Sequence, residues 1–274
     1  MTSWTQEIEI ASSLARKAGE IIMNIYKQDF SVSYKGTNDP VTEADQLANA
    51  LIVKGLADYF PQDVIIAEES PLPTESQLTG RIWYVDPLDG TKEFIARNGE
   101  FSIMIGLTLN GQSQLGVVYR PTEDQLFAGI TDQKAWMEHQ GASHALKATQ
   151  VKNPTALALV ASRSHRSPRL SEVKHTLNIQ EEHPMGSVGL KIGFIANGGA
   201  DLYMEPGPYT KSWDACAPEA ILRGAGGCFT DIHGNPIQYG TNDVRNLHGV
   251  LATTQDCHER VLQALTGLCV SCEG

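Results

Sequence analysis

Two aspartates that follow an apolar run are the residues in this chain most able to do chemistry. Residues 82–85 are apolar, and the segment 86–91 reads DPLDGT. Mg²⁺ prefers oxygen ligands and is commonly held by one or two carboxylates, so Asp86, Asp89 and the carbonyl of Leu88 could bind it. The alternative is that both aspartates form an Asx-type turn and cap a helix, which is common beside Pro and Gly.

Other acids stand beside apolar runs or at the starts of helical patterns, namely Asp45, Glu68, Glu69 and Asp214. Several carboxylates that converge would repel one another without a cation, so their number favours a metal site. Each also has an ordinary alternative. Asp45 could complete a cap with Thr42, Glu69 could be a solvated surface acid, and Asp214 could cap its own helix.

Phosphate could bind beside the same turn. Gly90 and Thr91 precede a short helical pattern at residues 92–95, and exposed amides at a helix N-terminus bind anions. Further along the chain, a second set of residues suits another phosphate or a sugar, or else is simply solvated. This set is Arg163, Ser164, His165, Arg166 and Lys191.

The elements that must position these residues follow from apolar periodicity. The first thirty residues predict an amphipathic helix, and after a polar loop at residues 35–39 Thr42 is placed to cap a second helix. Apolar runs at 64–67 and 82–85 predict strands that end in acids. Residues 101–137 predict an antiparallel meander with turns such as Asn110-Gly111.

The pattern changes near residue 150 from this α+β arrangement to alternating strands and helices. Strands are predicted at 157–161, 202–204, 228–231 and 250–253, and helices after Ser187, around 214–222 and at 258–268. We therefore predict two subdomains, an α+β metal-binding unit at 1–150 and an α/β substrate-binding unit at 151–274.

Composition limits the function classes. The 274 residues carry a net charge of −11 and are 41% hydrophobic, which excludes a disordered chain and disfavours a nucleic-acid polymer as partner. The sequence shows no signal-peptide pattern and no apolar stretch of the length of a membrane span, so we expect a cytoplasmic protein. Five cysteines are an odd number and predict reduced thiols, with no redox or zinc role expected for Cys269 and Cys272.

Four segments together resemble the inositol monophosphatase superfamily: DPVTEAD at 39–45, EES at 68–70, DPLDGT at 86–91 and WD at 213–214. The longer segment DPLDGTKEFI resembles the CysQ-like 3'(2'),5'-bisphosphate nucleotidases within it. Three further segments agree, SRSH at 162–165, WDACAPEAIL at 213–222 and TDIHGNPIQY at 230–239. Ala67 and Ala215 depart from residues that many relatives carry, Gly and Thr respectively, and neither departure removes a predicted ligand.

The resemblance implies a two-subdomain layered αβαβα sandwich of the inositol monophosphatase and fructose-1,6-bisphosphatase type. It implies two or three Mg²⁺ ions, with metal ligands at Glu68, Asp86, the Leu88 carbonyl, Asp89 and Asp214. Asp45 and Thr91 take the family's water-activating positions, with Glu68 also counted as catalytic. Substrate contacts are implied for Leu88, Asp89, Gly90, Thr91, Ser164, His165, Lys191 and Asp214.

The implied reaction is hydrolysis of the 3'(2')-phosphate of a bisphosphate nucleotide such as 3'-phosphoadenosine 5'-phosphate, with lithium sensitivity. One alternative is a phosphatase for inositol monophosphate or inositol 1,4-bisphosphate. Another is a non-catalytic protein that binds a phosphorylated metabolite. A homo-oligomer and peripheral attachment at the inner face of the membrane also remain open.

Overall fold

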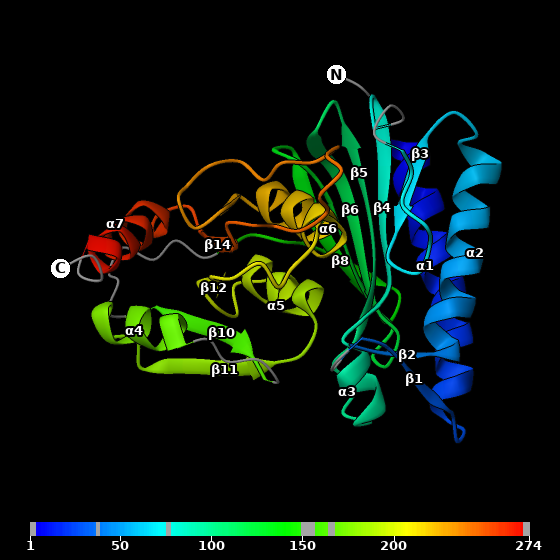
Figure 1. The fold of residues 1–274 in the computed structure, drawn as a ribbon, viewed down its shortest axis with the longest axis horizontal. Helices are drawn as coiled ribbons and strands as arrows, with labels where there is room; N and C mark the ends of the chain where they lie inside the picture. The colour runs from blue at the N-terminus through cyan, green and yellow to red at the C-terminus, as the bar shows by residue number, and fades with distance from the viewer. Residues whose placement is uncertain (1–3, 37–38, 75–77, 149–156, 164–167, 271–274) are drawn as a thin grey trace.

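The structure is a computed structural model that describes residues 4–36, 39–74, 78–148, 157–163 and 168–270. Helices and sheets alternate in it as five layers, which follow one another from right to left in Figure 1. Two helices cover a large sheet, two lie between the sheets, and two cover a smaller sheet. The predicted αβαβα sandwich is therefore confirmed.

The larger sheet has seven strands in the order β3-β4-β5-β6-β7-β8-β9. The β3–β4 pair is parallel, and each later pair is antiparallel. The strands are β3 (Val64–Ala67), β4 (Arg81–Asp89), β5 (Ser102–Leu109), β6 (Gln112–Arg120), β7 (Gln125–Ile130), β8 (Lys134–His139) and β9 (Ala142–Ala145). The predicted meander is confirmed, and β4 carries both aspartates at its end.

Helices α1 (Thr5–Tyr26) and α2 (Glu43–Tyr59) cover the outer face of this sheet. Their apolar faces join side chains of β4 to β7 in one buried cluster. The predicted cap of the second helix is confirmed as a capping box. The Thr42 side chain accepts from the backbone N–H of Asp45, and the Asp45 carboxylate accepts from the backbone N–H of Thr42.

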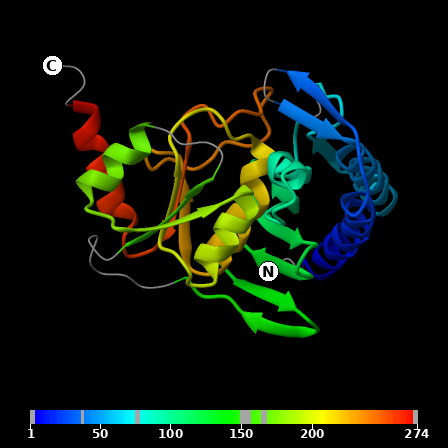
Figure 2. The same ribbon diagram turned by 90° about the horizontal axis from the view of Figure 1, so that it is seen from below.

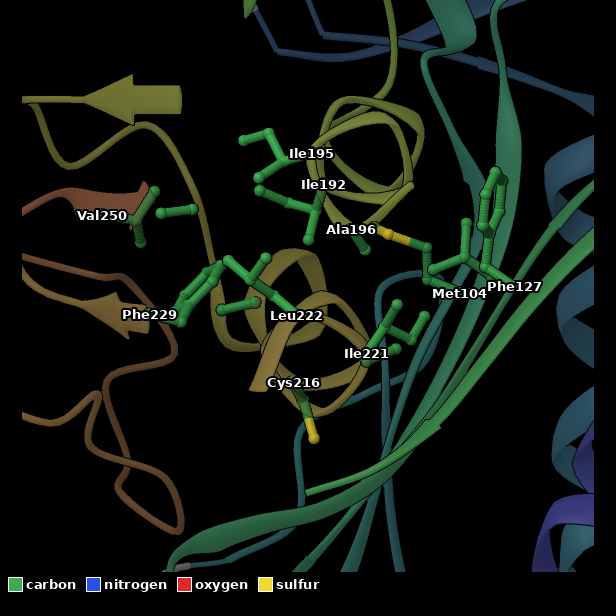
Figure 3. Close-up of a cluster of buried hydrophobic side chains, with 14 of the residues drawn as sticks. Met104, Phe127, Ile192, Ile195, Ala196, Cys216, Ile221, Leu222, Phe229 and Val250 are labelled. Atoms are coloured by element: carbon green, nitrogen blue, oxygen red, sulfur yellow. The ribbon is translucent and has the colours of Figure 1, made fainter. Parts of the chain in front are cut away.

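Helices α5 (Val188–Ala196) and α6 (Ser212–Gly224) form the middle layer, which appears in yellow tones between the two sheets in Figure 2. Met104 and Phe127 from the large sheet lie beside Ala196 of α5 and Ile221 of α6 there (Figure 3). Phe229 and Val250 approach from the smaller sheet. The middle layer is thus packed on both faces.

The smaller sheet has the strand order β11-β10-β12-β14-β13. Its strands are β10 (Ala158–Ser162), β11 (Glu181–Met185), β12 (Leu202–Glu205), β13 (Gly227–Thr230) and β14 (Val250–Thr254). Helices α4 (Pro168–Thr176) and α7 (His258–Val270) pack on its outer side through a third apolar cluster. Predicted strands and helices in this half are confirmed to within a few residues.

Several elements were not predicted from the sequence. The polar loop expected at 35–39 was wrong in part, because β1 (Val32–Gly36) and β2 (Asp39–Thr42) form an antiparallel hairpin. The strands β9 and β11 and helix α4 were not predicted either. β1 and β9 are almost wholly exposed, so they lack the apolar alternation on which a strand prediction depends.

The boundary predicted near residue 150 remains a prediction, and residues 149–156 lie outside the described ranges. The central apolar cluster draws side chains from both sides of that boundary, because α5 and α6 pack against strands of the large sheet. None of the described helices combines the length and the apolar character that crossing a bilayer requires.

Candidate active site

The end of β4 is irregular at the point where it carries its two aspartates. Its register with β5 shifts between Asp86 and Asp89, on either side of Pro87. Pro87 has no N–H to donate to the ladder, so regular pairing is interrupted there. The N–H of Leu88 instead donates to Asp86 Oδ1 at 3.0 Å, which fixes that buried carboxylate.

Helix α6 supplies a third carboxylate from the second half of the chain. Asp214 lies in the first turn of the helix, and its Oδ2 accepts a hydrogen bond from the backbone N–H of Lys211 at 2.6 Å. One carboxylate oxygen from each of Asp86, Asp89 and Asp214 can be chosen so that the three lie within 4.8 Å of one another. We call these three residues the acidic group.

Asp89 is held from the opposite side by the start of α5. Its Oδ2 accepts hydrogen bonds from Ser187 Oγ at 2.6 Å and from the backbone N–H of Gly189 at 3.0 Å. Ser187 also caps α5 by accepting from the N–H of Leu190. The acidic group therefore depends on β4, α5 and α6 together.

Burial and mutual repulsion disfavour the charged form of this group. Burial raises the pKa of Asp214 to about 7, and the charges of Asp89 and Glu68 add to that rise. Burial also raises the pKa of Asp86 well above its ordinary value, helped by Glu68 and by the other two aspartates. The pKa of Asp89 is raised by burial, although the charge of Lys191 opposes the rise.

Such a group fits a divalent cation. The donors are hard carboxylate oxygens, with no described thiol or imidazole in the group, which suits Mg²⁺ better than a transition metal. A bound cation would favour the charged carboxylates and so oppose the effect of burial on these pKa values. The acidic group is therefore suited to bind a metal ion. The number of ions stays a prediction.

Glu68 lies beside the acidic group without joining it. Its Oε1 accepts a hydrogen bond from Lys35 Nζ at 2.9 Å, and the same ammonium donates to Glu69 Oε1 at 2.6 Å. Glu68 still lies close enough to raise the pKa of Asp86 and of Asp214 by its charge. Its predicted role as a metal ligand and catalytic residue stays a prediction.

The predicted water-activating residues contact each other. Thr91 Oγ1 lies 3.1 Å from Asp45 Oδ1 and 3.3 Å from the Leu88 carbonyl oxygen. The other oxygen of Asp45 accepts from the N–H and the hydroxyl of Thr42, at 2.8 and 2.6 Å. Burial raises the pKa of Asp45, and the hydrogen bonds from Thr42 oppose that rise.

Thr91 begins the short helix α3 (Thr91–Ile95), with Gly90 as its N-cap. Gly90 has φ 96°, a backbone conformation that residues with a side chain rarely adopt. A Cβ there would lie 3.1 Å from the Glu100 carbonyl oxygen. Glycine is thus required where the chain leaves the acidic group. Phosphate contact by the Gly90 and Thr91 amides remains a prediction.

A cleft of about 440 Å³ opens beside these residues, with Asp89, Gly90, Thr91 and Asp214 in its walls. Lys191 also lines it and is buried, with Nζ donating to the Gly186 carbonyl oxygen at 3.2 Å. Burial lowers the pKa of Lys191, while the charges of Asp89 and other acids oppose that change. Ser164 and His165 lie outside the described residues.

Several residues of the cleft wall were not predicted from the sequence. Those missed include Ser162, Ser187, Tyr203, Glu205, Tyr209 and Lys211. Ser187 was predicted only to precede a helix. Its position as a helix cap was the one feature of the sequence that could have indicated a role in orienting Asp89. Glu205 and Tyr209 carried no local signal, because their closeness to β4 depends on how the two sheets pack.

These features define the class of the protein, a five-layered α/β fold with an acidic metal site at the meeting point of its layers. The chain belongs to the inositol monophosphatase family, whose model matches residues 3–268.

Individual relatives agree with this assignment. The chain is 40% identical to the 3'(2'),5'-bisphosphate nucleotidase CysQ of Escherichia coli strain K12, over 82% of this chain and 91% of the relative. The crystal structure of CysQ from Bacteroides thetaiotaomicron matches with a TM-score of 0.78 and 29% identity, covering 92% of this chain and 98% of that one. The extragenic suppressor protein suhB from Bartonella henselae shares the fold, with a TM-score of 0.82, 23% identity and coverage of 95% and 98%.

Proposed function

We propose that this chain is a Mg²⁺-dependent phosphomonoesterase that removes the 3'(2')-phosphate of 3'(2'),5'-bisphosphate nucleotides. With 3'-phosphoadenosine 5'-phosphate it would release AMP and phosphate. The observation that carries the proposal is the acidic group in the wall of a cleft that also contains Thr91 and Lys191. The bisphosphate nucleotidase named among its relatives supports the choice of substrate.

Asp86, Asp89 and Asp214 would hold magnesium, joined by Glu68 and the Leu88 carbonyl. Bound there, magnesium supplies positive charge that neutralises the phosphoryl oxygens and lowers the pKa of bound water. Lys35 donates to Oε1 of Glu68, so Oε2 is the oxygen that Glu68 would offer as a ligand.

Asp45 and Thr91 would move the proton of the attacking water. Thr91 gives its hydroxyl hydrogen to Asp45 Oδ1, 3.1 Å away, and takes a proton from the water in exchange. The raised pKa of Asp45 makes it a stronger base than an exposed aspartate. Hydroxide then attacks phosphorus, the bond to the 3'-oxygen breaks, and solvent protonates the released ribose oxygen.

The remaining substrate contacts are proposed from their places in the chain. Lys191 would balance phosphate charge from the inner wall of the cleft. Ser164 and His165 directly follow the cleft residue Ser162 and its neighbour Arg163, and would contact the nucleotide. The 5'-phosphate would remain on the product, and a cytoplasmic, oligomeric enzyme stays a prediction.

The test is phosphate release from 3'-phosphoadenosine 5'-phosphate, inositol 1-phosphate and inositol 1,4-bisphosphate, each with Mg²⁺ and with chelator. We expect Mg²⁺-dependent turnover with preference for the nucleotide. The substitution Asp89→Asn should lower kcat by at least about 100-fold with the fold retained. Asp58→Asn, which removes an exposed carboxylate of α2, serves as the matched control.

Preference for an inositol phosphate would overturn the substrate assignment and leave the metal site in place. Near-normal turnover by the Asp89→Asn enzyme would overturn the proposed metal ligands. If no phosphate ester is hydrolysed while the folded protein still binds AMP, the chain is a phosphometabolite-binding protein instead.

A further inference from the structure

An aromatic side chain stands exposed in the wall of the active-site cleft. Tyr209 is 77% exposed, more than any other large apolar or aromatic residue whose exposure is described. It lies in the loop that joins β12 to α6, and it lines the same cleft as Asp89 and Asp214. Exposure of a large ring at this place leaves apolar surface uncovered beside the proposed reaction centre.

The Gly207 backbone lies close to one edge of the ring. A Cβ added at Gly207 would lie 2.5 Å from Cε2 and 2.7 Å from Cδ2 of Tyr209, so glycine leaves the space that this edge of the ring occupies. Prolines flank that glycine at 206 and 208 and limit the loop. The N–H of Gly207 also donates to Glu205 Oε1 at 3.2 Å, which ties the loop to β12.

No structural role accounts for the ring. Tyr209 belongs to none of the three apolar clusters, and within the described part of the chain its hydroxyl has no hydrogen-bond partner. An aromatic ring that is exposed in a cleft wall is a surface on which a planar group can stack. Such stacking is tolerant of the identity of the base, because every nucleobase has a π face.

The chemistry of the ring also separates two classes of substrate. A nucleobase is flat and gains from stacking on Tyr209. An inositol ring is a puckered polyol that offers hydroxyl groups and has no π face. We propose that Tyr209 is the platform on which the nucleobase of the substrate stacks, and so selects nucleotides over inositol phosphates. The inference rests on the proposed function and specifies its substrate site.

The experiment compares Tyr209→Ala and Tyr209→Phe with the wild-type enzyme on two substrates. One is 3'-phosphoadenosine 5'-phosphate, and the other is ribose 3,5-bisphosphate, which keeps both phosphates and lacks the base. Tyr59→Ala is the control, since Tyr59 is a 58% exposed tyrosine at the end of α2 that is absent from the cleft wall.

We expect Tyr209→Ala to raise KM for the nucleotide by about 10-fold or more with little change in kcat. KM for ribose bisphosphate should stay within about twofold, and Tyr209→Phe should behave as wild type. AMP affinity measured by calorimetry should fall in the same proportion, which gives a readout independent of turnover.

Equal loss on both substrates would overturn the inference, because it would indicate a general effect of the loop. Unchanged KM and AMP affinity in Tyr209→Ala, with a wild-type enzyme active on the nucleotide, would overturn the inference alone. A wild-type enzyme that hydrolyses inositol phosphates and leaves the nucleotide intact would overturn the proposed function together with the inference.

Discussion

At the scale of single residues, the Asp45 side chain has two roles, one in the cap of α2 and one in the proposed proton transfer. Asp45 uses one oxygen to cap α2 through Thr42 and the other to accept a hydrogen bond from Thr91. The cap fixes the orientation of the carboxylate, because two donors hold the same oxygen. A helix cap and a proton acceptor are thus the same side chain.

A double-mutant cycle tests that arrangement. Thr91→Val and Asp45→Asn should each lower kcat by about 100-fold or more, since either change removes the path for the proton. The double variant should be little worse than the worse single variant, because the two residues act as a unit. Steady-state kinetics at saturating Mg²⁺ measures the effect, and additive losses would contradict a shared path.

The matched control is Thr42→Ala. That change removes the side-chain half of the capping box, while the backbone N–H at position 42 still donates to Asp45 and the Asp45–Thr91 hydrogen bond stays in place. We expect a loss of about 1 kcal/mol in the free energy of unfolding, as for other caps, with a far smaller effect on kcat. Thermal unfolding of the same samples separates the two effects.

At the scale of elements, α6 reaches its position because three strands of the large sheet present glycine to it. A Cβ at Gly116 would lie 2.2 Å from the Ala217 carbonyl oxygen, and one at Gly129 would lie 2.5 Å from Ile221 Cα. At Gly106 the added atom would lie 2.6 Å from Cys216 Sγ. Helix and sheet therefore approach at backbone distance, and this approach brings Asp214 to the end of β4.

Gly116→Ala should displace α6, since a carbonyl oxygen cannot move out of the way as a flexible side chain can. We expect a loss of about 2–3 kcal/mol in stability, or roughly 5–10 °C in Tm, and weaker activation by Mg²⁺ because Asp214 moves with the helix. Calorimetry and Mg²⁺ titration of activity measure the two effects. Gly36→Ala is the control, because nothing lies within 4 Å of a Cβ there.

An unchanged Tm in Gly116→Ala would show that α6 can be shifted at little cost. A lowered Tm with unchanged activation by Mg²⁺ would separate the position of Asp214 from the packing of α6.

At the scale of the whole molecule, the acidic group lies where the large sheet meets the middle layer of helices. Its carboxylates come from β4 and α6, and α5 orients one of them. Without metal this junction holds buried negative charge, and the protein as a whole also carries −11. Metal binding should therefore stabilise the assembled layers as well as enable chemistry.

The pH dependence of stability in chelator tests that idea. The folded pKa of Asp214 is about 7, above its ordinary value of 3.8. At a pH between these two pKa values, Asp214 keeps a proton in the folded protein and releases it in the unfolded chain. The free energy of unfolding therefore falls as pH rises from about 4 through 7. We expect the Tm of the metal-free protein to fall over that range and Mg²⁺ to restore it above pH 7.

Asp214→Asn should raise the metal-free Tm at pH 8 and remove most of the rise caused by Mg²⁺, although it abolishes turnover. The control is Asp243→Asn. Asp243 is exposed, and hydrogen bonds from Arg245 lower its pKa to about 2, so its charge is constant between pH 5 and 8. An Asp214→Asn protein that is less stable than wild type at pH 8 in chelator would contradict a repulsive acidic group.

Helices and strands whose residues carry a local pattern could be predicted from the sequence. Apolar periodicity located α1, α2 and the meander, since one buried face is enough to reveal a helix or a strand. The motifs at 39–45 and 86–91 predicted the capped helix and the acidic turn, and their resemblance to a family predicted the five layers. Exposed strands such as β1 and β9 were not predicted, because exposed positions place little constraint on the type of side chain.

Which residues meet at the acidic group depends on the tertiary structure. Asp214 caps α6 by accepting from the N–H of Lys211, and it also joins Asp86 and Asp89 because glycines let α6 approach the large sheet. Ser187, Glu205 and Tyr209 reach the same cleft from other layers. The apolar pattern of a segment indicates which of its faces is buried. The distances between segments depend on packing that many residues determine together.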